Sequence, residues 1–206
     1  MDHDRLLQGL VGWPYPVSRA ALPLTMRVAG EACELRELQG IPVATVLAAY
    51  DALSVQTIYL RFMRPKLIPT AQQLSHFLEY DPARQISLLL ITNDGELMAQ
   101  AQSIRRRRNP ESAEFSCLVA DHFQHRGAGR RILLALALLA RAAGIREWTA
   151  EVLAENRPML SLLKHLGLPL TLVMGRELVF VRLELSVLDE WLPVLPGKPT
   201  PNTKGE

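Results

Sequence analysis

The most informative segment of the chain reads Leu118-Val119-Ala120-Asp121-His122-Phe123-Gln124-His125-Arg126-Gly127-Ala128-Gly129-Arg130-Arg131. It joins an apolar stretch at 113–120, typical of a strand, to a stretch of strong helix formers at 129–143 that ends before Gly144. Its glycines allow a tight turn and leave the first amides of the helix uncovered, and its arginines add positive charge. The segment therefore predicts a cradle for a pyrophosphate at the start of a helix.

Glycine spacing alone fits a second interpretation equally well. Gly127 and Gly129 could simply begin a helix whose arginines face solvent, because short glycine motifs are common. Two nucleotide-binding motifs are excluded, however. The third glycine of a dinucleotide fingerprint is missing, and no Gly-Lys-Ser/Thr follows as in a phosphate-binding P-loop.

Hydrophobic patterning outward from this segment predicts a sheet with helices packed on it. The turn Asn93-Asp94-Gly95 between two apolar runs is typical of a hairpin. The order of elements predicts an α/β protein of the α+β type, with a mixed, mostly antiparallel sheet flanked by helices. The expected strands are 25–28, 33–38, 86–92, 97–104, 113–120, 148–153 and 178–185, and the expected helices are 43–53, 70–78, 129–143 and 158–166.

Length and composition predict one globular domain. The chain has 206 residues, 49% of them hydrophobic, and a formal net charge of +2, which is too small to indicate nucleic acid as a partner. Clustered prolines predict an extended arm at 1–24 and a disordered tail at 189–206, with the folded domain at 25–188. No secretory signal is evident and the longest apolar run, 132–140, is too short to span a membrane, so we expect a cytoplasmic protein without a membrane partner.

The cysteines and histidines do not form a recognisable metal or disulfide pattern. Cys33 and Cys117 are far apart in sequence, which argues against a disulfide framework and a zinc motif. His122 and His125 have no cysteine or carboxylate partner at ligand spacing. We therefore expect no metal site.

The segment 124–129 resembles motif A of the GNAT acetyltransferases, Gln/Arg-x-x-Gly-x-Gly/Ala, and Asn156-Arg157-Pro158-Met159-Leu160 resembles their motif B. The resemblance implies a GNAT-like fold, acetyl-coenzyme A as co-substrate, a pyrophosphate on motif A, and an asparagine that contacts the cofactor arm. The cofactor-binding residues expected on this basis are Leu118, Val119, Ala120, Gln124, Arg126, Gly127, Ala128, Gly129, Arg130, Arg131, Asn156 and Met159.

A narrower likeness is to bacterial protein lysine acetyltransferases of the Pat type, in segments 54–62 and 151–159. The likeness extends over about residues 25–185. It implies a protein lysine as the acceptor, with acyl-coenzyme A synthetases as the substrate class. A small-molecule amine acetyltransferase and a non-catalytic acyl-coenzyme A sensor remain as alternatives.

Glu114 is the first candidate for the general base. A lysine amine has a reference pKa near 10.4, so neutralising it at pH 7 costs about 4 to 5 kcal/mol. Glu114 lies near the start of an apolar strand, before a bulge expected at 118–119, and the Pat resemblance implies the same role. A backbone amide near Val119 or Ala120 is expected to hold the thioester oxygen. Glu151 is the reserve base; both carboxylates could instead simply face water.

Two further positions bear on the chemistry. Leu163 stands where many GNAT enzymes carry a tyrosine that protonates the leaving thiolate, so the thiolate is expected to leave unprotonated. Cys117 could accept the acetyl group first, although a free cysteine is more often a small buried hydrophobe.

Two surface features leave several possibilities open. The run 105–108, four consecutive arginines, could dock an acidic protein surface, bind nucleic acid or lie in a solvated hairpin. The apolar helix face at 132–139 is typical of a core, but its breadth could also support a homodimer.

Overall fold

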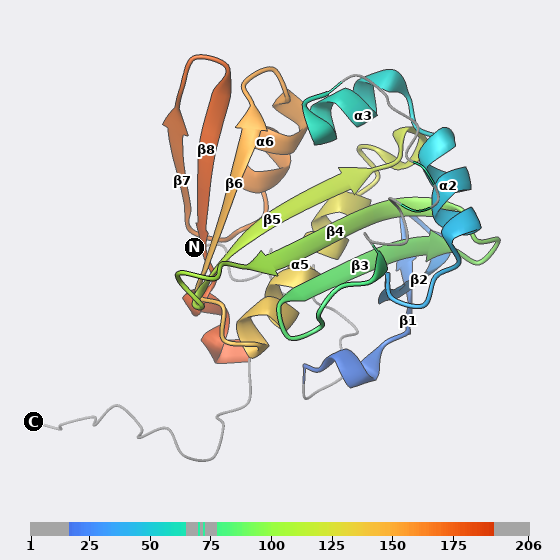
Figure 1. Ribbon diagram of the computed structural model, residues 1–206, viewed down its shortest axis with the longest axis horizontal. Coiled ribbons are helices and arrows are strands. Elements are labelled where there is room, and N and C mark those ends of the chain that lie inside the picture. The colour runs from blue at the N-terminus through green and yellow to red at the C-terminus, as the bar shows by residue number, and fades with distance from the viewer. Residues whose placement is uncertain (1–16, 65–69, 71, 73–77, 192–206) are drawn as a thin grey trace, which may run out of the picture.

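The computed structural model describes residues 17–64, 70, 72 and 78–191, and within them eight strands form one sheet (Figure 1). The strand order is β1-β2-β3-β4-β5-β6-β8-β7, and every neighbouring pair is antiparallel except β5 and β6. This confirms the expected mixed, mostly antiparallel sheet. The strands are β1 (Leu24–Val28), β2 (Glu31–Glu37), β3 (Gln85–Thr92), β4 (Leu97–Arg105), β5 (Ser112–Val119), β6 (Glu147–Leu153), β7 (Leu170–Met174) and β8 (Leu178–Glu184).

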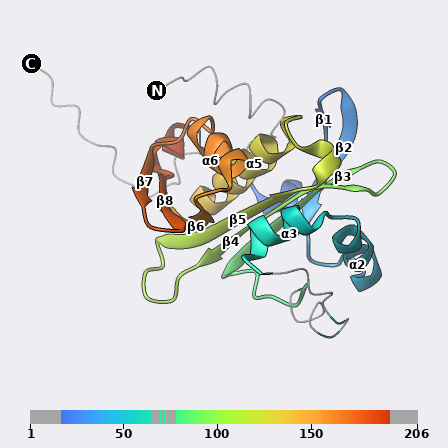
Figure 2. The same ribbon diagram turned by 90° about the horizontal axis from the view of Figure 1, so that it is seen from above.

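Helices cover both faces of the sheet, with α5 and α6 on one side and α2 and α3 on the other (Figure 2). The α-helices are α2 (Val43–Asp51), α3 (Val55–Phe62), α5 (Ala128–Ala142) and α6 (Arg157–Lys164), and the 3-10 helices are η1 (Arg19–Ala21), η2 (Asp121–Phe123) and η3 (Ser186–Trp191). All residues of α5 from 132 to 140 are buried, and the helix packs on β3, β4 and β5. The apolar face of this helix is therefore core, so a homodimer would have to use another surface.

The sheet divides between β5 and β6, the one parallel pair among the described strands. β5 and β6 pair only where residues 112–114 face residues 147–149; beyond this, β6 follows β8 while β5 stays with β4 (Figure 1). The expected bulge at 118–119 is wrong, because the β4–β5 register runs without a shift from Arg105↔Ala113 to Ala99↔Val119. The end of β5 is freed because its neighbour on the other side departs.

The helix α3 and the strand β7 were not expected from the sequence. Ser54 caps α3, its hydroxyl accepting a hydrogen bond from the amide of Thr57 at 3.1 Å. β7 is a five-residue strand at the edge of the sheet, too short to stand out as a periodic pattern. The helix expected at 70–78 falls mostly outside the described residues.

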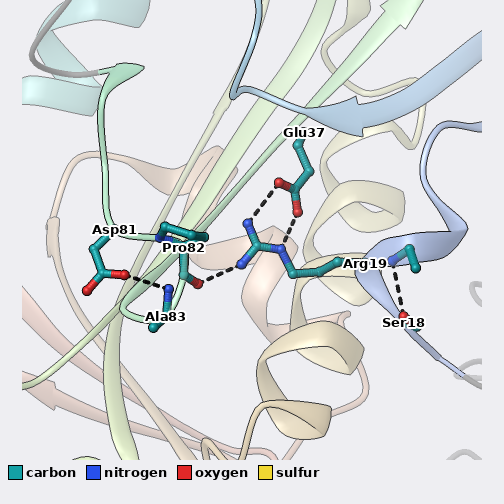
Figure 3. Close-up of polar contacts among 7 residues, drawn as sticks. Ser18, Arg19, Glu37, Asp81, Pro82 and Ala83 are labelled. Atoms are coloured by element: carbon teal, nitrogen blue, oxygen red, sulfur yellow. Dashed lines mark hydrogen bonds and ion pairs between the residues drawn. The ribbon is translucent and has the colours of Figure 1, made fainter.

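Side-chain contacts fix both ends of the described chain to the domain. The guanidinium of Arg19 in η1 binds both carboxylate oxygens of Glu37 on β2 and donates to the carbonyl of Pro82 at 2.6 Å (Figure 3). At the other end, Asp189 of η3 accepts a hydrogen bond from Arg141 on α5 at 2.8 Å. η3 thus continues the described structure past residue 188, where the domain was expected to end, and residues 1–16 and 192–206 lie outside the described ranges.

The arginine run begins with a structural residue. Arg105 donates to the backbone carbonyl of Pro110 and, at 2.5 Å, to that of Ala143, tying the β4–β5 turn to the end of α5. The next three arginines, 106–108, are exposed. In the part of the chain that is described, no single helix is long and apolar enough to cross a membrane; α2 and α3 reach that threshold only together, with a bend of 113° between them.

Candidate active site

A cavity of about 420 Å³ opens beside the end of β5, where β6 has left it. Its walls come from α3, the last residues of β5, the loop leading into α5, the first turn of α5, and α6. The lining residues are Thr57, Leu60, Arg61, Cys117, Leu118, Val119, Phe123, Gln124, His125, Gly127, Ala128, Gly129, Arg130, Asn156, Pro158, Met159, Ser161, Leu162 and His165.

The N-terminus of α5 points its positive end into this cavity. The two glycines at this end are required for different structural reasons. Gly127 caps the helix with φ +88°, a conformation that side chains rarely adopt, and no side chain caps it. A Cβ on Gly129 would lie 2.9 Å from Cδ2 of Leu162 and 3.0 Å from Cγ2 of Val119. The first-turn amides have no carbonyl four residues earlier in the helix to bond, which suits an anion such as a diphosphate.

The loop before α5 is joined to α3 by a polar network. The carboxylate of Asp121 accepts hydrogen bonds from the Ser54 amide at 2.9 Å, the Ser54 hydroxyl at 2.6 Å and the Thr57 hydroxyl at 2.7 Å. Burial opposes ionisation of Asp121, but these hydrogen bonds outweigh it and hold its pKa below the ordinary value. The side-chain Nε2 of Gln124 donates to Thr57 Oγ1 at 3.1 Å and to the Val119 carbonyl at 3.3 Å. The loop and α3 therefore hold each other in place.

Asn156 links the opposite wall to the same helix. Its buried side chain caps α6, accepting from the Met159 amide at 3.1 Å, and its Nδ2 donates to the carbonyl of Leu60 in α3 at 3.5 Å. Asn156 thus positions two walls of the cavity.

Most of the expected cofactor-binding residues line the cavity, but three do not. Ala120 is one, and its amide is already used, donating to the Met98 carbonyl at 3.0 Å. Arg126 turns away to pair with Glu31 at 3.6 Å, and Arg131 also lies outside the lining. The expected residues that do line it are Leu118, Val119, Gln124, Gly127, Ala128, Gly129, Arg130, Asn156 and Met159.

Neither candidate base lines the cavity. Glu114 is exposed and belongs to the last β5–β6 pair, opposite Thr149, before the strands part. Glu151 is also exposed and faces Phe180 on β8 instead of β5. Of the two carboxylates, Glu114 is therefore the one on the strand that leads to the cavity.

Arg61 is the main lining residue that the sequence did not single out. It projects from α3, and its Nη2 donates to Ser116 Oγ on β5 at 2.6 Å. The Ser54 cap that starts α3 was a local signal for this helix, but nothing local indicated which strand its arginine would meet.

Cys117 and Leu163 are both buried. Burial raises the pKa of the Cys117 thiol to about 12, so this group stays protonated at neutral pH. Leu163 is fully buried in the core and presents nothing to the cavity. Within residues 17–64, 70, 72 and 78–191, no group of three His, Cys, Asp or Glu side chains is placed to hold a metal ion.

Comparison with known sequences identifies one family and a curated relative. The profile of the acetyltransferase (GNAT) family matches residues 52–168. Acetyltransferase Pat of Mycolicibacterium smegmatis is 29% identical over 147 residues, which is 71% of this chain and 44% of that protein. The chain thus spans less than half the length of this relative.

Solved structures share the fold. The GNAT domain of S. lividans PAT aligns with a TM-score of 0.73 at 23% identity, covering 83% of this chain and 99% of that domain. The Salmonella typhimurium protein yncA, solved with its cofactor acetyl-CoA, aligns with a TM-score of 0.58 at 19% identity, covering 75% of this chain and 94% of that one. The expected architecture is that of these proteins.

Proposed function

The chain belongs to the GNAT acetyltransferase family, and from this premise we propose that it transfers an acetyl group from acetyl-coenzyme A to the side-chain amine of a protein lysine. The observation that carries the proposal is the cavity at the N-terminus of α5, where Gly127 supplies the positive φ of the N-cap and Gly129 lets the first helical turn pack closely against Leu162 and Val119. The amides of Ala128 and Gly129, with the nearby charge of Arg130, are the groups that would hold the diphosphate. Acetyl-coenzyme A supplies the acetyl group as an activated thioester.

Glu114 is the proposed base that removes the proton of the acceptor ammonium, directly or through a water. Its position supports this role, since it lies on β5 three residues before Cys117, the first residue of that strand to line the cavity. Deprotonation by a placed carboxylate offsets part of the roughly 4 to 5 kcal/mol that a neutral lysine amine costs at pH 7.

The amide of Val119 is the proposed donor to the thioester oxygen. Successive amides of a strand point to opposite edges, and that of Ala120 points to β4, where it bonds Met98. The Val119 amide therefore points to the other edge, from which β6 has departed. A donor fixed in this way can stabilise the oxygen as it gains negative charge.

Direct attack by the acceptor amine fits the remaining side chains. A Cys117 thiol with a pKa of about 12 is a poor nucleophile at neutral pH, which argues against a prior acetyl transfer to the protein. With Leu163 in the core, we propose that the thiolate leaves without a proton from that position.

The likeness to Acetyltransferase Pat supports a protein lysine as acceptor, with acyl-coenzyme A synthetases as the first substrates to try. The test measures thiol release and acetyl-lysine formation by mass spectrometry with wild type, Glu114→Gln and the matched control Glu151→Gln. We expect Glu114→Gln to lower kcat about 100-fold or more while its affinity for acetyl-coenzyme A, measured by calorimetry, stays unchanged. We expect Glu151→Gln to behave like wild type.

Three results would change the proposal. An unimpaired Glu114→Gln enzyme removes that residue from the mechanism. Acetylation of polyamines or amino acids but of no protein replaces the acceptor with a small amine. Tight binding of acetyl-coenzyme A without release of free coenzyme A in the presence of any acceptor makes the protein a sensor.

A further inference from the structure

A strip of polar side chains runs across the sheet on the face that carries α3. The β-ladders align Gln102 with Ser116 and Glu114 with Thr149, and paired residues share a face. The opposite face carries the apolar partners of the same strands, such as Phe115, within the core around α5. We call Gln102, Ser116, Glu114 and Thr149 the acceptor strip.

Two oxygen atoms of the acceptor strip are buried without a hydrogen bond. They are Oε1 of Gln102 and Oγ1 of Thr149, and neither has a partner within the described structure. Buried polar atoms in native proteins are nearly always paired with a protein group or a water, so both oxygens lack a donor that the described residues do not supply. Within the acceptor strip Glu114 is the exposed residue, so its carboxylate is the group that an acceptor ammonium, with three N–H donors, can reach.

Arg61 places a positive charge beside the same strip. Its bond to Ser116 uses one of five N–H donors, and the guanidinium also lies 4.8 Å from the ring centroid of Phe62. Burial lowers the pKa of Arg61, and the electrostatic attraction of Glu114 opposes this shift only in part. Among the residues described, no carboxylate comes within ion-pair distance of this guanidinium.

The two arginines that fix the ends of the described chain contrast with this arrangement. Arg19 is paired with Glu37, and Arg141 with Asp189. Removing a guanidinium from water without a counter-charge is costly, and its planar fork is shaped to bind a carboxylate through two bonds. The guanidinium of Arg61 is therefore available to a carboxylate that comes from outside the domain.

We propose that Arg61 binds a carboxylate of the acceptor, so that the enzyme selects amines that carry an acidic group nearby, such as a lysine flanked by an acidic residue. This inference rests on the proposed acetyl transfer and names the acceptor class for it. The bound carboxylate neutralises Arg61, which would otherwise repel the acceptor ammonium, and places that ammonium by Glu114.

The test compares two peptides that differ only in whether the target lysine has a glutamate or a glutamine beside it. For each peptide, kcat/KM is measured by coenzyme A release, and Kd is measured by fluorescence anisotropy in the presence of coenzyme A. The proteins are wild type, Arg61→Gln and Arg61→Lys. Arg27→Gln, at an exposed arginine on the edge strand β1, is the matched control.

We expect wild type and Arg27→Gln to favour the glutamate peptide about tenfold or more in both kcat/KM and Kd, the range of a charged hydrogen bond. Arg61→Gln is expected to abolish this ratio whatever its absolute rate, and Arg61→Lys to retain part of it because it keeps the charge but loses the fork. The free amino acids lysine and glutamate are assayed in parallel as acceptors. A preference for free amino acids over both peptides would assign the carboxylate to the acceptor's own α-carboxyl group, within the same proposal.

Equal use of both peptides by wild type with no preference for the free amino acids, or a preference that is unchanged in Arg61→Gln, overturns the inference. If no peptide or amino acid is acetylated, the proposed function fails instead, and the anisotropy ratios still decide whether Arg61 binds a carboxylate. Chemical unfolding and coenzyme A calorimetry on each variant establish that the protein is folded.

Discussion

Replacing Gly129 by alanine is expected to weaken coenzyme A binding more than it destabilises the fold. The new methyl group would lie 2.9 Å from Cδ2 of Leu162 and 3.0 Å from Cγ2 of Val119. Carbon atoms in contact prefer about 3.5 to 4.0 Å, so both neighbours must move. Both also line the cavity, so their movement changes the shape of the cofactor site.

Two opposing effects set the change in stability. Alanine is favoured over glycine inside a helix by about 0.8 to 1.0 kcal/mol, while overpacking costs about 1 to 3 kcal/mol. Because Cδ2 is the flexible end of Leu162, we expect the lower part of that cost and a net loss within about 1 kcal/mol. For a domain of this size, that corresponds to a shift in Tm of about 2 to 4 °C. The affinity for coenzyme A should fall about tenfold or more, which is about 1.4 kcal/mol.

Calorimetry with coenzyme A and urea unfolding of the same samples separate the two effects. Gly127→Ala is the comparison, because a Cβ there meets nothing within 4 Å but the residue has φ +88°. That variant should lose about 1 to 2 kcal/mol of folding stability from backbone strain. A Gly129→Ala protein with wild-type affinity for coenzyme A would refute the assignment of this helix terminus as the cofactor site.

Two further predictions concern buried groups. Cys117→Ala should retain acetyl transfer. Because burial raises the pKa of this thiol in the folded protein from about 9 to about 12, wild type should lose stability relative to the variant between those pH values, by up to about 1.4 kcal/mol per pH unit. A difference between the urea midpoints of the two proteins that is the same at pH 8 and at pH 10 would contradict this. Asp189→Ala leaves the guanidinium of Arg141, whose side chain is 6% exposed, without its carboxylate partner. The loss of folding stability should lie toward the lower end of about 3 to 5 kcal/mol, because Asp189 itself is half exposed. An unfolding free energy that stays within about 0.5 kcal/mol of wild type would show that the ion pair does not hold η3 to α5.

The features that could be derived from the order of residues are those with local causes. Asn93-Asp94-Gly95 forms a hairpin turn, the leucine- and alanine-rich stretch before Gly144 forms α5, and Gly127 with its positive φ begins that helix. Turn chemistry, helix propensity and the space beside a glycine act over a few residues, so a sequence displays them directly. The mixed sheet and the start of α5 at its two glycines were predictable for this reason.

The rest of the site was decided by the tertiary structure, because its contacts join distant parts of the chain. Asp121 meets Ser54 across 67 positions, and Arg61 meets Ser116 across 55. The amide of Ala120 is taken by β4 and Arg126 is drawn to Glu31, which removed two expected ligands from the cavity. Which partner a side chain or amide finds depends on how strands and helices pack, and no spacing within one segment contains that information.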